Sequence, residues 1–352
     1  MKKFPSIYIV VLLLVCSGVA VSATPGKLDI EQIHKAATGA KSLFLDEAGR
    51  VRAVDTFMQL VLIKGPSGKE KEVQEQLQSI LTKSGAAVIP PDSNDPKAPF
   101  NLVMEIPGTG ALAVRSGILL NAHIDTISRS TPELMVFDAN TGDFYHPDEK
   151  DPSKSSSFGG DDRSAVAVIV EAVRKLQADY WGKGVPHRRI LIVFTADEER
   201  GCRGARYLSK NEPDLFADLE ISLTMDGPLD YMSDYPRYSF VTVVSESDCE
   251  ILPYRHVIEL VQEFCGRIGA QFDRTKNGLG MGDFAQFPAS AHAGLHLRSP
   301  VRGFHMTERV KVQDLINHID LLCFILLGWD QSVPADISPQ AFTAALSRYV
   351  NR

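Results

Sequence analysis

Three adjacent carboxylates end an apolar run near the middle of the 352-residue chain. In the segment ILIVFTADEERG (190–201) the run is followed directly by Asp197, Glu198 and Glu199, with a glycine close behind. Neighbouring carboxylates repel one another, because a like charge nearby disfavours the ionised form. The cluster is therefore either a solvated acidic turn or half of a site in which two carboxylates have different functions.

Metal-binding side chains also follow other apolar runs of the chain. These are His123 and Asp125 after residues 117–122, Asp226 after residues 219–225, and His305 shortly after residues 293–297. A further candidate, Asp161, begins a helical segment in GGDDRSAVA. In open α/β sheets, ligands bind at the carboxyl ends of the strands, so residues scattered along the chain can converge there.

Each candidate also has an ordinary structural explanation. Asp161 or its neighbour Asp162 suits the N-cap of the helix that follows, and Asp226 before a glycine suits a turn. A single histidine at a strand end is usually held by ordinary hydrogen bonds. The coincidence favours a site, because every candidate lies at a junction where one would form.

The donor types predict two metal positions that share one carboxylate. A carboxylate such as Asp161 has two oxygens and can bridge two cations about 3.5–4 Å apart. The two expected ligand sets are His123, Asp161 and Asp226, and Asp161, Glu199 and His305. Imidazole and carboxylate ligands without cysteine suit zinc best, although cobalt or manganese would also be accepted.

Two further carboxylates have expected functions beside the metals. Asp125 lies two residues after His123 on an extended segment, so both side chains point the same way and Asp125 can orient the imidazole. Glu198 remains free to take a proton from a water whose pKa the cations lower towards neutrality. The chemistry predicted is hydrolysis by an activated water.

Short β-branched runs alternate with helical patterns along the chain. The expected strands are residues 101–106, 117–122, 189–195, 219–225, 238–244 and 293–297, and the expected helices are residues 51–63, 67–85, 163–177, 254–269 and 312–329. Ser67 and Gly85 are the expected caps of the second helix, and a β-hairpin is expected to turn at NTGD (140–143). The alternation predicts an α/β fold, a mainly parallel mixed sheet covered by helices on both faces as a three-layer sandwich.

The composition is that of a soluble globular protein, with 44% hydrophobic and 23% charged residues and a net charge of −7. Basic residues form no long run, which argues against a nucleic-acid partner. The first residues, MKKFPSIYIVVLLLVCSGVAVSA, are typical of a signal peptide for export to the periplasm or the exterior. We expect cleavage after Ala23, which leaves residues 24–352 as one catalytic domain without a membrane span; lipid modification of Cys16 is the alternative.

Five segments, in this order, resemble the signature set of the co-catalytic di-zinc exopeptidases over roughly residues 50–330: NAHIDT, FGGDDRSAVAVIVEA, TADEERGCRGARYL, TMDG and FHMTE. That superfamily includes peptidase T, the aminoacylase and carboxypeptidase G group, and the secreted leucyl aminopeptidases. The resemblance implies a zinc-exopeptidase (phosphorylase/hydrolase-like) fold and two zinc ions bound by the ligand sets above. It also implies that Glu198 is the general acid/base and Asp125 the aspartate behind the histidine ligand, and it makes Asp283 in GMGDF (280–284) a candidate for substrate contact.

The chain departs from one branch of these relatives. Peptidase T and the aminoacylase group usually carry an inserted lid domain after the motif that contains Asp226. Here the interval from Asp226 to Asp283 has room for one strand and one helix, so the chain resembles the lidless secreted aminopeptidases. Because the lid often supplies carboxylate-binding residues, we expect an exopeptidase that reads a free amino terminus.

The expected activity is cleavage of short peptides by an aminopeptidase or a dipeptidase. Two alternatives share the fold: an amidohydrolase of N-acyl amino acids, and a glutaminyl cyclase that uses one zinc. A catalytically inactive binding module is the third alternative. Inactive relatives typically lose metal ligands, whereas all five ligand positions and Glu198 carry competent residues in this chain.

Overall fold

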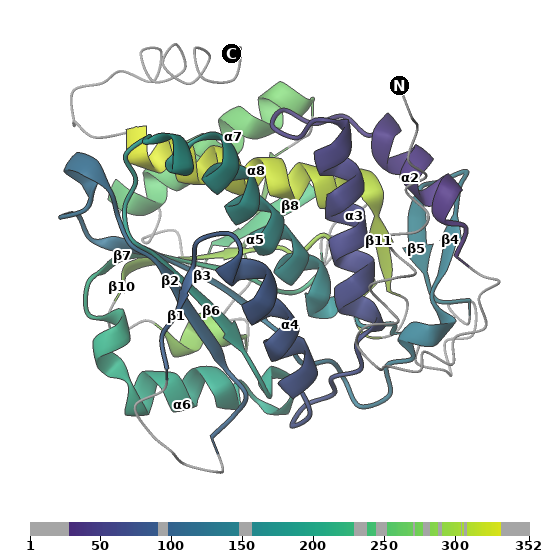
Figure 1. Ribbon diagram of the computed structural model, residues 1–352, viewed down its shortest axis with the longest axis horizontal. Coiled ribbons are helices and arrows are strands. Elements are labelled where there is room, and N and C mark those ends of the chain that lie inside the picture. Colours follow the sequence, from purple (N-terminus) through teal and green to yellow (C-terminus); the bar gives the residue numbers. More distant parts are fainter. Residues whose placement is uncertain are drawn as a thin grey trace.

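The computed structural model describes residues 28–90, 98–147, 157–228, 238–243, 252–269, 272–276, 282–287, 291–303, 305 and 308–331. The expected signal peptide, residues 1–23, and Cys16 within it lie outside these described residues. Figure 1 labels the helices and strands.

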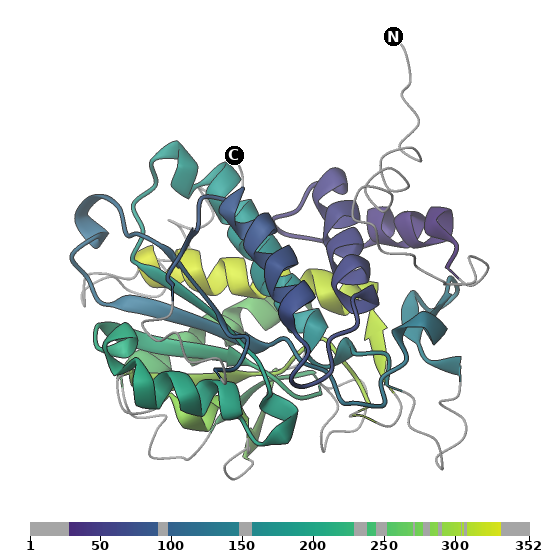
Figure 2. The same cartoon turned by 60° about the horizontal axis from the view of Figure 1, so that its bottom comes forward.

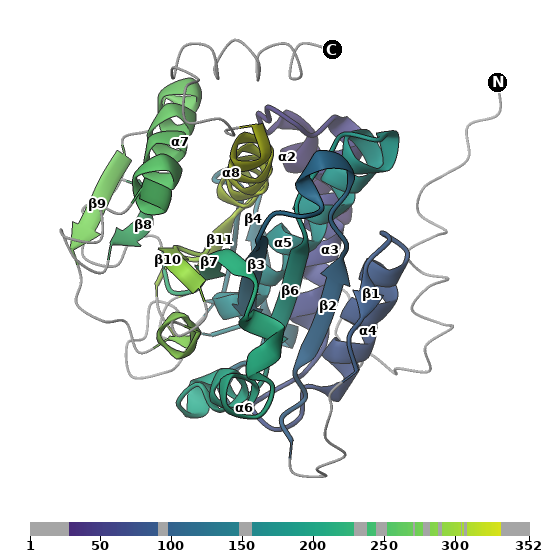
Figure 3. The same cartoon turned by 90° about the vertical axis from the view of Figure 1, so that its left-hand side faces the viewer.

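An eight-stranded mixed sheet lies at the centre of the molecule (Figure 1). Its strands are, in spatial order, β1 (Ala87–Val88), β2 (Leu102–Ile106), β6 (Ile190–Thr195), β3 (Gly117–His123), β7 (Leu219–Met225), β10 (Ala291–Leu297), β8 (Tyr238–Val243) and β9 (Phe272–Lys276). Figure 3 displays the same order. Strands β6, β3, β7 and β10 are parallel, and β2 and β8 join them in antiparallel orientation on either side. The mainly parallel mixed sheet predicted from the sequence is confirmed.

Alternation along the strands divides the core into two layers. In β6, Ile190, Ile192 and Phe194 belong to one buried cluster, whereas Leu191 and Val193 belong to another. Successive side chains of a strand point to opposite faces, so each face of the sheet contributes to its own cluster. The helices on the larger cluster are α2 (Ile30–Gly39), α3 (Glu47–Leu62), α4 (Lys71–Thr82), α5 (Gly160–Asp179), α7 (Leu252–Ile268) and α8 (Val312–Gln331). Helix α6 (Arg203–Asn211) covers the smaller cluster on the other face, opposite the yellow α8 in Figure 2.

Two helices of the larger layer bury almost their whole circumference. In α5, every residue from Gly160 to Val173 is buried, and the helix begins at the edge of the sheet where the parallel strands end. In α8, the segment Val312–Trp329 is long and apolar enough to cross a membrane by length and composition alone, but 94% of it is buried inside the molecule. Such burial is typical of a core helix in a globular fold.

A second, three-stranded sheet lies beside the main one. Strands β4 (Val136–Asp138) and β5 (Asp143–Tyr145) form the hairpin expected at residues 140–143, and β11 (Arg309–Lys311) pairs with β5. Helix α8 follows β11 directly. The hairpin therefore braces the segment that leads from His305 into the core.

Several elements differ from the sequence prediction. Helix α4 spans Lys71–Thr82 with Glu70 as its N-cap and Lys83 as its C-cap, so Ser67 and Gly85 are not its caps. The interval between Asp226 and Asp283 contains strand β9 in addition to the expected strand and helix. Helices α2 and α6 were also not expected. Strands β8 and β9 both extend the main sheet.

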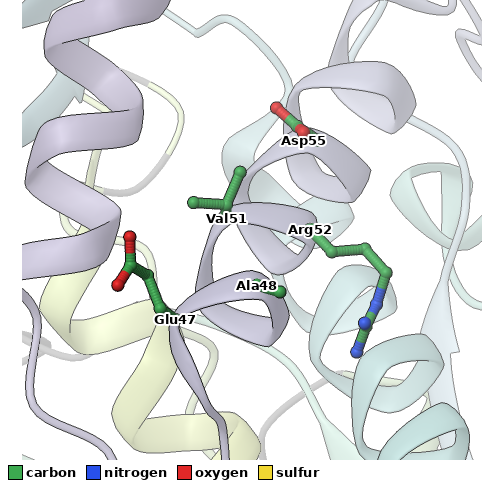
Figure 4. A pocket seen from close by; sticks show the side chains of 5 residues that line it. All are labelled: Glu47, Ala48, Val51, Arg52 and Asp55. Carbon is green, nitrogen blue, oxygen red and sulfur yellow. The ribbon is translucent and has the colours of Figure 1, made fainter. Parts of the chain in front are cut away.

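A surface pocket lies on α3, away from the residues singled out by the sequence. It is lined by Glu47, Ala48, Val51, Arg52 and Asp55 (Figure 4). None of the predicted site residues lines it.

Candidate metal centre

The candidate residues come together because four parallel strands end at one edge of the sheet. His123 is the last residue of β3, Asp226 follows β7 directly, and Glu198 and Glu199 follow β6 after a two-residue turn. Asp161 lies in the first turn of α5. The carboxyl ends of the strands thus hold the donors that the sequence scatters over more than 180 positions, as expected for an open α/β sheet.

The donors form two groups that share Asp161. His123 Nε2 lies 3.7 Å from Asp161 Oδ1 and 4.0 Å from Asp226 Oδ1. On the other side, His305 Nε2 lies 3.2 Å from Asp161 Oδ2 and 2.8 Å from Glu199 Oε1. Within each group all ligand atoms lie within 4.8 Å of one another. These are the two sets expected from the sequence, and each oxygen of Asp161 faces a different set.

The buried carboxylate oxygens of this centre fit a pair of cations. Asp161 is 2% exposed, and within the described part of the chain neither of its carboxylate oxygens accepts a hydrogen bond. Glu199 Oε1 is also buried, and it too accepts no hydrogen bond within the described part of the chain. Buried polar atoms are almost always hydrogen-bonded, and buried charges are paired or coordinate metals. Mixed imidazole and carboxylate donors in groups of three suit zinc with an open coordination position.

Asp125 connects His123 to the acidic turn. His123 Nδ1 lies 3.1 Å from the backbone carbonyl oxygen of Asp125 and 3.4 Å from its Oδ1, which leaves Nε2 facing the metal position. The Asp125 carboxylate also accepts the backbone N–H groups of Glu198 and Glu199, at 3.0 and 3.1 Å, and the hydroxyl of Ser67 at 2.7 Å. Burial acts to raise the pKa of Asp125, but these hydrogen bonds and the neighbouring His123 hold that pKa below its usual value. One carboxylate therefore positions a histidine and both glutamates.

The turn after β6 separates the two glutamates. Asp197 has a φ of 59°, a left-handed conformation that aspartate tolerates better than most residues. The chain then enters a single 3₁₀ turn, Glu198–Arg200. Glu199 faces His305, whereas Glu198 Oε1 accepts a hydrogen bond from the thiol of Cys202 at 3.3 Å. Asp197, for which the sequence predicted no role in the site, pairs with Arg203 at 2.9 Å.

The carboxylates of this centre shift the pKa values of their neighbours. Burial acts to lower the pKa of His305, but the Asp161 and Glu199 carboxylates raise it to about 10. Burial raises the pKa of Glu198 to about 8, and the nearby Asp226 and Asp283 carboxylates add to that rise. The carboxylates thus attract positive charge strongly, and a divalent cation would compete with protons for them.

Two acidic residues that were not predicted as site residues, Asp162 and Glu308, hold the site in place. Asp162 is fully buried and accepts hydrogen bonds from the hydroxyl of Ser299 and from the backbone N–H of His123. Glu308 Oε2 accepts the backbone N–H groups of residues 158, 159 and 160, the turn that leads into Asp161. Both acidic residues belong to segments whose neighbours had been noted, GGDDRS and FHMTE.

Asp283 lies at a different side of the centre from the metal-ligand candidates. It begins a 3₁₀ turn, Asp283–Gln286, is 2% exposed, and accepts a hydrogen bond from the hydroxyl of Thr195. Its nearest candidate partners are Glu198 and Cys202. Its expected role in substrate contact remains a prediction.

Comparisons with known proteins agree with this geometry. The model of a family described as Peptidase family M28 matches residues 101–321. No curated protein matches the chain.

Three solved structures illustrate the shared fold. Aminopeptidase PepT from Bacillus cereus ATCC 10987 has a TM-score of 0.59 at 15% identity, covering 78% of this chain and 97% of its own. The dipeptidase Dug1p from Saccharomyces cerevisiae has a TM-score of 0.61 at 10% identity, covering 87% and 99%. The LapA aminopeptidase from Legionella pneumophila has a TM-score of 0.56 at 14% identity, covering 86% and 76%. At such identities the likeness is one of fold.

Proposed function

The chain belongs to peptidase family M28 and is a metallopeptidase, and from this premise we propose that it is an exported aminopeptidase that uses two zinc ions to hydrolyse short peptides. The observation that carries the proposal is that Asp161 belongs to both of the groups of three donors. A carboxylate shared in this way is what a two-metal site requires. Cobalt or manganese could replace zinc in the same donor set.

The proposed site residues have separate functions in hydrolysis. His123, Asp161 and Asp226 would hold one zinc ion, and Asp161, Glu199 and His305 the other. When bound, such a pair of ions lowers the pKa of an attacking water and polarises the substrate carbonyl. Glu198 accepts the proton of that water at its carboxylate and passes it to the nitrogen of the leaving amine.

Asp125 keeps Glu198 and Glu199 in their separate positions. Its carboxylate accepts the backbone N–H groups of Glu198 and Glu199, and it faces Nδ1 of His123. A rotation of the turn would exchange the positions of the two glutamates, and these hydrogen bonds oppose it. Asp125 is therefore a positioning residue, because its carboxylate is occupied by protein donors.

Charge favours a substrate with a free amino terminus. Glu198 and Asp283 are two further carboxyl groups of the site beyond the proposed ligands, and the charge of Asp226 acts on both. A protonated amino group complements such a site, whereas a substrate carboxylate would be repelled by it. We therefore favour an aminopeptidase over a dipeptidase or an amidohydrolase of N-acyl amino acids.

A substrate panel tests the proposal. The purified protein is assayed with aminoacyl-p-nitroanilides, dipeptides, N-acyl amino acids and peptides with N-terminal glutamine. The proposal expects release of p-nitroaniline and no deacylation. Turnover only of N-acyl amino acids would replace it with the amidohydrolase, and ammonia release from N-terminal glutamine would replace it with the cyclase.

Metal analysis tests the number of ions independently of turnover. Elemental analysis of the protein after dialysis against zinc should give two zinc ions per chain. Asp161→Asn removes the shared carboxylate and should lower the content of both, whereas Asp226→Asn should lower one. Full-length protein that binds no zinc and gains no activity on zinc addition would favour a binding module.

Export is proposed from the first 23 residues alone. Expression of the complete chain in a host with a Sec pathway should yield a product that begins at Thr24, found in the periplasm or the medium. Mass spectrometry of the intact product distinguishes this from a lipid-modified Cys16 and from an uncleaved chain.

A further inference from the structure

Cys202 places a thiol beside the proposed general base. It lies four residues after Glu198 at the N-cap of α6, and its side chain is almost completely buried. The thiol donates a hydrogen bond to Glu198 Oε1 at 3.3 Å. The two proposed zinc sites contain no sulfur, so this thiol adds a donor of a different chemical kind at the margin of the site.

Asp283 completes a third group of donors from another segment. One of its carboxylate oxygens, Oδ2, accepts the hydroxyl of Thr195 at the end of β6. The other, Oδ1, is buried and accepts no hydrogen bond from the part of the chain that the structure describes. A buried carboxylate oxygen in this condition needs a proton, a water or a cation.

The three side chains are close enough to share one ion. Ligand atoms of Glu198, Cys202 and Asp283 all lie within 4.8 Å of one another. One thiolate and two carboxylates suit a borderline or soft divalent cation such as zinc or cadmium, and they suit magnesium or calcium poorly.

We propose that Glu198, Cys202 and Asp283 form a third cation site, which binds a thiophilic divalent cation and thereby inhibits the peptidase. The inhibition rests on the proposed function, because it requires Glu198 to be the general base. A cation bound to the Glu198 carboxylate withdraws charge from it, so the carboxylate accepts the proton of the attacking water less well. The two ligand sets around Asp161 are untouched, so the inhibited protein carries three ions.

Binding at this site is a proton exchange. The bond between Cys202 Sγ and the cation forms as the S–H bond breaks, and the proton leaves to solvent, since a coordinating thiol is deprotonated. No electrons are transferred. Because the holoenzyme already carries its two zinc ions, the peptidase responds to cation added in excess of these.

Spectroscopy of the two-zinc holoenzyme tests the site directly. Cadmium or cobalt is titrated into the holoenzyme while ultraviolet absorption, bound metal and peptidase activity are followed. A sulfur-to-metal charge-transfer band should grow with the first equivalent of added cation, which is the third ion on the chain, and activity should fall in parallel by more than tenfold at saturation. In Cys202→Ser the band should be absent, and the third ion should bind more weakly by more than about tenfold, because loss of even an outer partner of a metal ligand costs about 10–100-fold.

Two further variants separate the site from general effects on the protein. Cys265→Ala removes a thiol that is buried in the apolar core, and it should keep both the band and the inhibition. Asp283→Asn keeps the Cys202 thiol and should shift the titration of the band to higher cadmium. For each variant, inhibition is expressed as the ratio of its own activities with and without cadmium.

The failure of this inference differs from the failure of the proposed function. Turnover by a two-zinc protein that develops no charge-transfer band, or whose inhibition by cadmium is the same in Cys202→Ser, overturns the third site and leaves the peptidase proposal intact. A band that depends on Cys202 in a protein that hydrolyses no substrate of the panel retains the cation site and overturns its inhibitory function.

Discussion

Glu198 and Glu199 are consecutive, yet the turn at Asp197 directs them to different partners. Glu199 faces His305 at 2.8 Å, and Glu198 faces the thiol of Cys202. A carboxylate that binds a metal and one that moves a proton respond differently to the same substitution. The pair therefore offers a matched test in which the chemical change is identical and the position differs by one residue.

The first prediction is that Glu198→Gln keeps both zinc ions but lowers kcat by about 10²–10⁴-fold, the usual contribution of a general base. Glu199→Gln, the matched control, should lose one zinc ion as well as activity. Elemental analysis measures the zinc content of both variants, and steady-state kinetics measure their kcat. Glu198→Gln with nearly wild-type kcat would refute the proposed mechanism.

The second prediction concerns Ser67, which precedes the segment matched by the family model. Its hydroxyl donates to Asp125 at 2.7 Å and thereby helps to fix His123 and the acidic turn. Ser67→Ala should lower activity or zinc affinity by about tenfold, the lower end of the range for outer partners of metal ligands. Ser67→Thr keeps the hydroxyl and should restore most of the loss.

The control for Ser67 is Ser84→Ala, because the Ser84 hydroxyl donates a hydrogen bond to the backbone oxygen of Ile80, within its own helix end. This change should leave activity unaltered. Equal unfolding midpoints in urea for the two alanine variants would assign the effect of Ser67→Ala to the site. A purely structural role would instead lower stability while zinc affinity stayed the same.

Sequence reasoning found the residues that touch the centre, and Asp125 behind His123, but it missed the other residues behind them. His123, Asp161 and Asp226 stand at junctions between strands and loops, where residue type and position point to the same edge of the sheet. Ser67 was assigned to a helix cap, because its true partner Asp125 lies 58 positions away. Glu308 was not singled out, because a carboxylate that accepts three backbone N–H groups leaves no trace in residue spacing.

At the scale of elements, the buried strands were predictable and the marginal ones were not. Strands β3, β6 and β7 are rich in apolar residues and almost completely buried, since both of their faces are covered. Strand β9 reads FDRTK, a polar run at the edge of the sheet, which the hydrophobic pattern does not mark. Helix α6 has nine residues and buries a narrow stripe that includes Ala205 and Leu208, too short for a periodic pattern to stand out.

The third prediction concerns His318 in α8. Burial lowers the pKa of this imidazole to about 4, against 6.5 for the unperturbed group, although its hydrogen bond with the backbone oxygen of Asp314 acts in the opposite direction. Between pH 6.5 and 4 the unfolded chain therefore binds a proton that the folded chain does not. The stabilisation is fully present above pH 6.5 and is lost as the pH falls towards 4.

Urea unfolding at pH 7 and pH 4.5 measures this contribution. His318→Gln has no titrating group, so its free energy of unfolding should fall less between the two pH values than that of the wild type, by about 2–3 kcal/mol. Metal-free protein is used for both, so that zinc release does not contribute. An equal fall in both proteins would contradict the assignment.

At the scale of the whole molecule, the centre joins elements that packing and hydrogen bonds also hold together. Its candidate ligands come from β3, from the start of α5, from the turns after β6 and β7, and from the segment that precedes β11. Ions bound at that point would connect the carboxyl ends of the central strands with the helix layer. Zinc is then predicted to stabilise the fold as well as to serve catalysis, because a ligand that binds only the folded chain shifts the unfolding equilibrium.

The fourth prediction follows from this connection. At a free zinc concentration of about 100 times its Kd, one ion stabilises the folded state by about 2.7 kcal/mol. Each kcal/mol shifts the melting temperature by about 2–4 °C in chains of about 150–250 residues. A chelator should therefore lower the melting temperature of the holoenzyme by several degrees, and zinc should restore it. Asp161→Asn, which weakens both sites through their shared ligand, should melt at the same temperature with and without chelator. If the chelator leaves the melting temperature of the wild type unchanged, the carboxylates and imidazoles stabilise one another without zinc.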